Sequence, residues 1–502
     1  MRLTRKCPPK GGCYSRKESK KETLVKGRSV PLEYGTVQIK KETPQSGAPS
    51  AVSVIGLGKL GAPMAACLAA KGRRVIGVDV DARKVEAINE GFAPVFETGL
   101  EELIGRSNGR LRATGDITEA VATSEITFIV VATPSEATGG FSNRYVLSTC
   151  EAVGRALRAK RDFHVVAVTS TVMPGSTGGA IRAALELASG RHAGEDFGLC
   201  YNPEFIALGS VIRDFLNPDF VLIGESDSRS GDALETLYRE ICDNVPRFAR
   251  MNLLNAEIAK LSVNAFVTTK ISFANMLARM CERLPGADVD VVTAALGLDN
   301  RIGAKYLKGS VSYGGPCFPR DNLALAAFAR SIGAPADIAE ATHRFNLLQI
   351  DLLAGLVKKH LISGGRAGIL GLTYKPSTDV VEQAAGYLLA QKLAADGVSV
   401  LASDPAGNVN AAQGLDGSLV LIDSAEECIE RSDVVVVATA WPQYKTIPAE
   451  TWTRSAKSPR VVIDCWRSLG VLENSPGIVY LALGAGETST AGEREAMRQS
   501  AL

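Results

Sequence analysis

The sequence is poor in the residues and patterns that mark several classes of protein. It has four histidines in 502 residues and no clustered His, Cys or carboxylate ligands, so no metal site is predicted. Its ten cysteines form no CxxC pair, and we expect most of them to be buried small side chains. No uncharged apolar run reaches the roughly 18 residues of a membrane span, and the N-terminus lacks a signal-peptide core. These absences argue against a disulfide scaffold and a membrane protein, and they predict a cytoplasmic location.

Net charge is also low, but it is unevenly placed. The formal net charge is +2, whereas residues 1–49 carry 12 Lys and Arg against 4 Asp and Glu, a net of +8. This segment has little apolar periodicity, so we interpret it as a disordered basic tail. The alternative is an arm that binds nucleic acid or a membrane surface. For the protein as a whole we predict neither a nucleic-acid nor a membrane partner.

Apolar runs alternate with helical patterns along the chain, which is too long for one ordinary domain. Strands are expected at residues 51–55, 74–79, 126–132, 165–169, 199–202 and 221–224, and again at 366–371, 398–403, 433–438 and 461–464. Continuous apolar strands that alternate with helices predict parallel, doubly wound sheets. Residues 250–285 break this alternation with apolar positions at helical spacing, which indicates a long helix between two α/β units.

The predicted fold is therefore α/β, with two Rossmann-like domains of doubly wound parallel sheet and a helical domain between them. The expected limits are a basic tail at 1–49, a first Rossmann domain at 50–248, a central helical domain at 249–350, a second Rossmann-like domain at 351–484 and a flexible tail at 485–502.

A dinucleotide fingerprint opens the first α/β unit. The loop Gly56-Leu57-Gly58-Lys59-Leu60-Gly61 lies between a strand and a helix, and Asp79 ends the next strand, 18 residues beyond Gly61. The first glycine makes the turn, the second lets backbone approach a pyrophosphate, and the third lets the helix pack closely. Asp79 can bind a ribose diol and would repel a 2′-phosphate, so NAD is predicted as the cofactor. The segment 368–371 is a weaker match, either a structural turn or a site for a second nucleotide.

A cysteine loop lies far downstream. Cys317 sits in Tyr313-Gly314-Gly315-Pro316-Cys317-Phe318-Pro319-Arg320-Asp321, just before a helical run expected at 322–332. A helix N-terminus favours a thiolate, and a thiol is a nucleophile for carbonyl carbon. A hydride acceptor and a carbonyl-seeking thiol together predict oxidation beyond the aldehyde, through a thioester, to an acid.

Residues 51–470 resemble the UDP-glucose/GDP-mannose dehydrogenase family. The resemblance rests on motifs in a fixed order: GLGKLG with Asp79, Val131-Ala132-Thr133-Pro134, Thr169-Ser170-Thr171-Val172-Met173-Pro174-Gly175, Asn202-Pro203-Glu204-Phe205, Ala256-Glu257-x-x-Lys260-x-x-x-Asn264, the Cys317 loop, and Tyr374-Lys375-Pro376-x-Thr378. It implies a four-electron oxidation of a nucleotide-sugar primary alcohol to a carboxylate with two NAD. It also implies that the central helices form the contact of a homodimer or a higher homo-oligomer.

The resemblance also implies roles for individual residues. Catalysis is expected from Cys317 as nucleophile, Asp321 in proton transfer, Lys260 and Asn264 at the reacting carbon, and Glu204 with Thr171 around a water, with Glu204 as a possible base. Cofactor contacts are expected from Gly56, Gly58, Lys59, Leu60, Gly61, Asp79, Thr133, Pro134 and Thr171. Substrate contacts are expected from Phe205, Lys260, Asn264, Arg301, Tyr306, Gly314, Gly315, Lys375 and Arg467. Asp321 can also serve as a helix N-cap.

The sequence departs from the family pattern at several positions around these motifs. The departures are Leu208 where a glutamate is usual, Phe220 where an arginine is usual, Arg320 for a lysine, and Glu382 in place of an acidic-arginine run. They spare Cys317 and the other expected catalytic residues, so the chemistry is predicted to be intact. UDP-glucose is the first expected substrate, with GDP-mannose and a UDP-N-acetylhexosamine as alternatives.

Two other functions stay open at this point. A two-electron β-hydroxyacid dehydrogenase shares the first Rossmann unit and a Lys–Asn helix, but it needs neither the cysteine loop nor a second α/β domain. A non-catalytic nucleotide-sugar binding protein would explain the departures from the family pattern. Such a protein would bind a nucleotide sugar without turnover.

Overall fold

The computed structural model describes residues 51–413, 419–454 and 459–486. The predicted basic tail at 1–49 lies outside the described residues, and so does the predicted flexible tail from residue 487 onward. Residues 485 and 486, which were also assigned to that tail, are described. Ala485 forms a bridge with Asp288, and the Gly486 N–H donates to the Ala287 carbonyl at 2.9 Å.

The first α/β unit is built on an eight-stranded sheet with the order β3-β2-β1-β4-β5-β6-β7-β8. Every strand pair is parallel except β6 with β7, so the Rossmann order β3-β2-β1-β4-β5-β6 carries a further pair at one side. The strands are β1 Ala51–Ile55, β2 Arg74–Val78, β3 Leu111–Thr114, β4 Ile126–Ile129, β5 Val165–Val168, β6 Gly198–Tyr201, β7 Phe220–Glu225 and β8 Arg247–Asn252.

Helices connect these strands and bury both faces of the sheet. Along β5, Val165 and Ala167 belong to one hydrophobic cluster, and Val166 and Val168 belong to another. This alternation is the reason that the central strands are apolar throughout. The helices are α1 Gly61–Ala70, α2 Ala82–Glu90, α3 Leu100–Gly105, α4 Ile117–Ala122, α5 Arg144–Ala159, the π-helical turn η1 Thr177–Ile181, α6 Arg182–Ser189, α7 Val211–Leu216 and α8 Ser228–Ile241.

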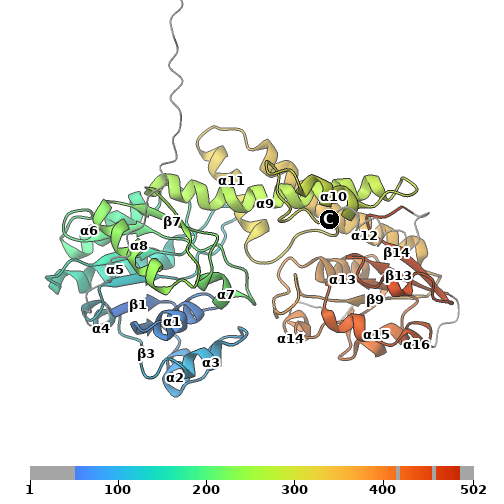
Figure 1. Cartoon of the computed structure of the whole chain (residues 1–502), viewed down its shortest axis with the longest axis horizontal. Coiled ribbons are helices and arrows are strands. Elements are labelled where there is room, and N and C mark those ends of the chain that lie inside the picture. Colours follow the sequence, from blue (N-terminus) through green and yellow to red (C-terminus); the bar gives the residue numbers. More distant parts are fainter. Residues whose placement is uncertain (1–50, 414–418, 455–458, 487–502) are drawn as a thin grey trace, which may run out of the picture. The chain divides into compact units, whose positions relative to one another are not determined.

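A helical segment follows the first sheet. They are α9 Leu253–Cys281, α10 Val289–Gly297, α11 Phe318–Ser331 and α12 Asp337–His360. Helix α9, drawn in yellow-green in Figure 1, begins with a side-chain cap, because the Asn252 carboxamide oxygen accepts the Asn255 N–H. Its buried face carries polar as well as small apolar side chains, including Glu257, Lys260 and Asn264. A helix whose buried stripe holds ionisable groups is expected to border a functional site.

The second α/β unit is a six-stranded, fully parallel sheet with the order β11-β10-β9-β12-β13-β14. Its strands are β9 Arg366–Leu370, β10 Ser399–Ser403, β11 Leu419–Leu421, β12 Val434–Val437, β13 Arg460–Asp464 and β14 Ile478–Ala482. Its helices are α13 Ala385–Ala395, α14 Asn408–Ala412, α15 Ala425–Glu430, the 3₁₀ turn η2 Pro442–Thr446, α16 Ala449–Thr453 and the 3₁₀ turn η3 Gly470–Leu472.

The predicted fold class is confirmed, with corrections in detail. Four strands were not predicted, namely β3, β8, β11 and β14. The helix expected from residue 322 begins at Phe318, because Pro319 occupies its first turn, where proline is tolerated. Among the described residues, no helix has the length and apolar character needed to cross a membrane.

Candidate active site

The glycine loop of the first sheet has the geometry of a phosphate-binding turn. Gly56 follows β1 with φ of +103°, and a Cβ on it would lie 2.4 Å from the Val130 carbonyl oxygen. A Cβ on Gly61 would lie 1.8 Å from the Gly56 carbonyl oxygen, whereas Gly58 faces open space. The first and third glycines are therefore required by packing, and the second leaves the N-terminus of α1 accessible to a pyrophosphate. Leu60 is the N-cap residue of α1.

Asp79 lies one residue beyond β2, at the edge of this loop. Its carboxylate accepts the Leu57 N–H at 2.8 Å and the Asp81 N–H at 2.9 Å, and Lys84 lies 3.3 Å away. One oxygen therefore ties the carboxylate to the glycine loop, and further lone pairs stay available for a ribose diol. These residues fit an NAD adenosine group, and Lys84 partly offsets the repulsion that Asp79 exerts on a 2′-phosphate.

Cys317 is the N-cap residue of α11, and it is exposed. The other described cysteines are buried or half-buried, as expected of small structural side chains. The Asp321 N–H donates to the Cys317 carbonyl at 2.8 Å, so the carboxylate stands one helical turn after the thiol. Just upstream, Gly315 has φ of +83°, and a Cβ on Gly314 would lie 2.2 Å from the Gln383 carbonyl oxygen. Backbone contact with the segment at 380–384 thus fixes the cysteine loop.

The structure brings Asp321 together with the two expected polar residues of α9. The Asn264 amide donates to the Asp321 carboxylate at 2.6 Å, and both side chains are buried. Burial raises the pKa of Asp321, while Lys260, the Asn264 hydrogen bond and Arg320 lower it. Lys260 Nζ donates to the Glu204 carbonyl at 2.5 Å and lies 4.5 Å from the centre of the Phe205 ring. Lys260, Asn264 and Asp321 therefore form one buried polar cluster at the start of α11.

The thiol of Cys317 is not activated by the helix dipole alone, contrary to expectation. Although the residue is exposed, the protein packed around its sulfur disfavours the thiolate and raises the pKa of the Cys317 thiol, and the Asp321 carboxylate raises it further. The Lys260 and Arg320 cations lower it but do not reverse the direction. A nearby base is therefore needed to take the thiol proton at neutral pH, and Asp321 is placed to do so.

Glu204 is a second ionisable group with a shifted pKa. Burial raises the pKa of Glu204 to about 7, and Tyr238 and Lys260 act in the opposite direction. The Tyr238 hydroxyl lies 2.6 Å from the Glu204 carboxylate and 2.8 Å from the Asn202 amide oxygen. A carboxyl group that titrates near neutral pH is suited to general base catalysis. Sequence reasoning missed Tyr238, which lies on α8, 34 residues after Glu204, and has no local signal.

Three departures from the family pattern have a visible place in the structure. The Phe220 ring packs against Phe205, with centroids 4.7 Å apart, and so supports a predicted substrate contact. Arg320 donates to the Thr133 carbonyl at 2.9 Å and lies over the Phe141 ring at 4.3 Å. Arg320 thus ties the start of α11 to the loop after β4. At Glu382, the backbone carbonyl accepts the Gly315 N–H at 2.9 Å, and the carboxylate raises the pKa of the Cys317 thiol. In the described part of the chain, no contact explains the Leu208 departure.

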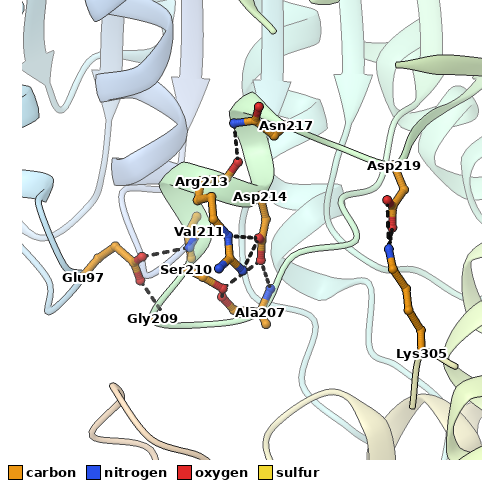
Figure 2. A network of polar contacts seen from close by, with 10 residues as sticks. All are labelled: Glu97, Ala207, Gly209, Ser210, Val211, Arg213, Asp214, Asn217, Asp219 and Lys305. Atoms are coloured by element: carbon orange, nitrogen blue, oxygen red, sulfur yellow. Dashed lines mark hydrogen bonds and ion pairs between the residues drawn. The ribbon is translucent and has the colours of Figure 1, made fainter. Parts of the chain in front are cut away.

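The loop after Phe205 is held by a buried carboxylate, Glu97, from the connection between α2 and α3. Figure 2 shows Glu97 pointing at this loop, where it accepts the Gly209 N–H at 2.9 Å and the Val211 N–H at 2.8 Å. Within the loop, Asp214 accepts from the Ser210 hydroxyl at 2.8 Å and the Ala207 N–H at 3.3 Å. These contacts fix the backbone directly after Glu204 and Phe205. Sequence reasoning missed Glu97, which lies over 100 residues earlier in the chain.

Several predicted residues lie at the carboxyl ends of neighbouring strands. Thr133 and Pro134 follow β4, Thr171 follows β5, and Glu204 follows β6. Ligands of doubly wound sheets bind at this edge, next to the point where the strand order reverses. The sheet order β1-β4-β5-β6 therefore places these residues in sequence from the glycine loop toward α9.

Other predicted residues are engaged elsewhere. Arg467 is buried, pairs with Asp290 at 2.8 Å and donates to two carbonyl groups, so the structure does not bring it to the cluster. Arg301 is exposed and pairs with Asp299 at 2.6 Å. Lys59 pairs with Asp379 at 2.8 Å.

Two other predicted substrate residues are Tyr306, which lies near the cysteine loop, and Lys375. Tyr306 has φ of +63° and places its ring 6.0 Å from that of Phe318, the residue after Cys317. Lys375 is half-buried, and burial lowers its pKa. Among the described residues, no group of three or more His, Cys, Asp or Glu side chains is arranged to hold a metal ion.

Comparison with known proteins accounts for both sheets and the helices between them. Three family models match in order: the NAD binding domain of the UDP-glucose/GDP-mannose dehydrogenase family at 50–242, its central domain at 254–347, and its UDP binding domain at 368–470.

Curated relatives and a solved structure agree with this match. The UDP-glucose 6-dehydrogenase AglM of Haloferax volcanii is 34% identical over 436 residues, which cover 86% of this chain and 99% of the relative. The GDP-mannose 6-dehydrogenase of Azotobacter vinelandii is 33% identical over 418 residues, with 79% and 94% covered. The structure of a UDP-glucose dehydrogenase from Pyrobaculum islandicum matches with a TM-score of 0.80 and 34% identity, covering 88% of this chain and all of that chain. The chain therefore belongs to the UDP-glucose/GDP-mannose dehydrogenase family of nucleotide-sugar dehydrogenases, and its cofactor is NAD.

Proposed function

We propose that this protein oxidises the C6 primary alcohol of UDP-glucose to the carboxylate of UDP-glucuronate through a thioester on Cys317. The observation that carries the proposal is the exposed Cys317 at the start of α11, one turn before a buried Asp321 that is bonded to Asn264. A thiol is needed only if oxidation continues past the aldehyde, because a simple alcohol dehydrogenase does not require a covalent intermediate.

The first oxidation converts the C6 alcohol to an aldehyde. NAD, when bound, accepts the hydride in this step and in the next one. Lys260 and Asn264 share one face of α9, and they would hold the C6 oxygen as its negative charge develops. Asp321, which is bonded to Asn264, would take the hydroxyl proton and release it to water before the next step.

The second oxidation takes place on the sulfur. Asp321 takes the thiol proton as the Cys317 sulfur bonds to the aldehyde carbon, and it returns that proton to the aldehyde oxygen, which gives a thiohemiacetal. Loss of a hydride from C6 and a proton from its hydroxyl then gives a thioester. Glu204, whose pKa burial raises to about 7, takes a proton from the water that it holds with Thr171. This water attacks the thioester carbon, the C–S bond breaks, and the carboxylate and the free thiol are formed. Each turnover thus consumes two NAD and one water.

Substrate recognition is assigned to the residues around the cluster. Phe205 and Tyr306 offer ring faces, and the Gly314–Gly315 backbone lines the approach to Cys317. Lys375 would meet the substrate from the loop after β9, in the part of the chain that matches a UDP binding domain. The relatives include enzymes named for UDP-glucose and for GDP-mannose, so GDP-mannose is the principal alternative substrate.

A homodimer is part of the same proposal. Helix α9 exposes Phe266, Phe273, Met276 and Met280, which recur at intervals of seven, three and four residues and so follow one stripe. A contiguous apolar stripe of this kind is normally covered by a partner. We assign this stripe to contact with a second copy, in which Arg301 would reach the partner's substrate. Light scattering after size-exclusion chromatography measures the copy number directly.

The test is the yield of NADH per mole of sugar with UDP-glucose, GDP-mannose, UDP-N-acetylglucosamine and UDP-galactose, for the wild type and Cys317→Ser. Two NADH per UDP-glucose, and loss of steady turnover in the variant, are expected. One NADH, or full activity in the variant, would replace the thioester mechanism with that of a two-electron dehydrogenase. Binding of a nucleotide sugar without any NADH would mean a binding protein.

A further inference from the structure

Glu257 is a buried carboxylate on α9 for which the reaction above has no use. It precedes Lys260 by one helical turn and Asn264 by two, so the three side chains share one face of the helix. Its side chain is fully buried. One carboxylate oxygen accepts the Gly175 N–H at 2.6 Å, and the other accepts the Thr177 N–H at 2.7 Å.

Among the residues that the structure describes, no cation forms an ion pair with this carboxylate. Its hydrogen bonds within the described part of the chain are those from Gly175 and Thr177. Burial raises the pKa of Glu257, and the bonds from the two residues lower it. Tyr201 is a buried ionisable neighbour, and the Glu257 charge contributes to raising its pKa. A buried carboxylate that is held by neutral donors alone is costly, so its position calls for a specific purpose.

The two N–H groups belong to the loop that carries Thr171. This loop leaves the carboxyl end of β5 and reaches the π-helical turn η1 at Thr177. Capping groups usually come from a residue beside the helix start, whereas Glu257 lies 80 residues after Thr177 in the sequence. Its carboxylate therefore joins two distant segments, α9 with Lys260 and Asn264, and the loop with Thr171.

We propose that Glu257 is a positioning residue that fixes the Thr171 loop against the Lys260 and Asn264 face of α9. The inference rests on the proposed function, because the distance between Thr171 and Lys260 matters only if both residues take part in the proposed reaction. The hydride donor carbon and its acceptor must be held in register, and a displacement of about 1 Å costs about 100-fold in rate. A carboxylate suits this task because both of its oxygens accept, while an amide offers one acceptor and one donor.

The variants Glu257→Gln and Glu257→Asp test this role, with Asp227→Asn as a matched control. Asp227 also accepts a backbone N–H at 2.9 Å, from Ser230 at the start of α8 in the same domain, but it contacts none of the residues assigned to the reaction. The Gln variant keeps the size of the side chain and places an NH2 group against a backbone N–H. The Asp variant keeps both acceptors on a shorter arm.

Two readouts are needed, namely NADH formation from UDP-glucose, and hydrogen exchange of the Gly175 and Thr177 amides. For Glu257→Gln we expect kcat to fall about 10- to 100-fold, faster exchange at both amides, and a melting temperature close to that of Asp227→Asn. Glu257→Asp should recover part of kcat and part of the protection. The control should keep both at wild-type values.

A folded Gln variant with wild-type kcat, or with unchanged exchange at both amides, would overturn the proposal. If the Gln variant does not fold, the Asp variant decides by the same two readouts. If the wild type oxidises no nucleotide sugar, the proposed function fails. The exchange measurement would then still show whether Glu257 holds the loop.

Discussion

The two sheets of this protein begin with the same turn and then diverge. The glycine after the first strand has positive φ in both, +103° at Gly56 and +97° at Gly371. The glycine that opens the next helix is equally constrained, because a Cβ on Gly61 or Gly386 would lie 1.8 or 1.9 Å from the carbonyl oxygen of the earlier glycine. Both units therefore use the same pair of glycines to pack a helix against the first strand.

What differs is the length of chain between the paired glycines. Gly61 follows Gly56 by five residues, which leaves a tight loop around a phosphate group. Gly386 follows Gly371 by fifteen residues, and the added length carries Lys375 and the backbone that packs on the cysteine loop. The second unit thus has a longer loop, packed on the cysteine loop, where the first unit has a phosphate-binding turn.

The carboxylates after the second strand of each unit differ in the same sense. Asp79 keeps acceptor capacity for a ribose, as described above. Asp404 is buried and accepts the N–H groups of Leu372, Thr373, Ala406 and Gly407 at 2.7 to 2.9 Å. Its oxygens are used to hold its own loop, so the second unit cannot bind a ribose diol as the first one does. One framework therefore gives one dinucleotide site and one site of another kind.

Substitution of these two carboxylates should have the largest and most different effects on stability and NAD binding. Asp404→Asn should destabilise the fold by about 3 kcal/mol, because the new amide would place donors against buried N–H groups. Asp79→Asn should leave the melting temperature nearly unchanged and weaken NAD binding roughly 10- to 100-fold, with less discrimination against NADP. Calorimetry of unfolding and of NAD binding for both variants gives the answer. Equal loss of NAD affinity in the two variants would contradict the assignment of the dinucleotide site to the first unit.

The paired glycines supply a second contrast. Gly61→Ala and Gly386→Ala should each cost about 1–3 kcal/mol of stability, since each Cβ overlaps a carbonyl oxygen of the preceding turn. In protein that remains folded, the loss of NAD affinity should be confined to Gly61→Ala. Urea unfolding together with NAD titration distinguishes the shared framework from the site that only one unit has.

The pH dependence of kcat tests whether Glu204 of the first unit acts as a base. Because the pKa of Glu204 is about 7 and its ionised form is the base, kcat should rise about tenfold per pH unit below 7 and level off above it. Tyr238→Phe removes a hydrogen bond that lowers this pKa, so the midpoint should move up by about 1 unit. Tyr480→Phe is a matched control, since the Tyr480 hydroxyl lies 2.8 Å from the Asp464 carboxylate in the second unit. A midpoint that shifted equally in both variants would remove Glu204 from the profile.

The smallest effect is expected in the loop of Figure 2. Glu97→Gln should loosen residues 207–211 and raise KM for the nucleotide sugar several-fold, with little change in kcat. Asp219→Asn, which removes an exposed pair with Lys305, should change stability by about 0–1 kcal/mol and leave KM unaltered. Steady-state kinetics on both variants would refute the loop assignment if KM moved in neither or in both.

The sequence predicted the interior of each sheet far better than its margins. The four strands that were missed, β3, β8, β11 and β14, are the edge strands of the two sheets. Each is partly exposed, and β3 and β8 mix polar with apolar residues. Strand β11 has only three residues, and β14 is apolar throughout, so mixed polarity does not explain why these two were missed. Burial on both faces produces the continuous apolar signal on which such predictions rest, and β3 and β8 lack it.

The candidate site shows the same division. Residues in compact motifs, such as Cys317 with Asp321 and Lys260 with Asn264, were predicted because local spacing places them together. Tyr238, Glu97 and the partners of Glu257 were not, since their contacts join segments 34 to 114 residues apart. The upward pKa of Cys317 was also missed, because it depends on burial that no local pattern records.

The most direct test of the central claim is a rapid acid quench of Glu204→Gln mixed with NAD and UDP-glucose, followed by peptide mass analysis. Without the base that activates water, the thioester should accumulate. We expect a burst of two NADH per active site and a uronyl group attached to Cys317. A burst of one NADH with no adduct, or an adduct at another residue, would contradict the thioester mechanism.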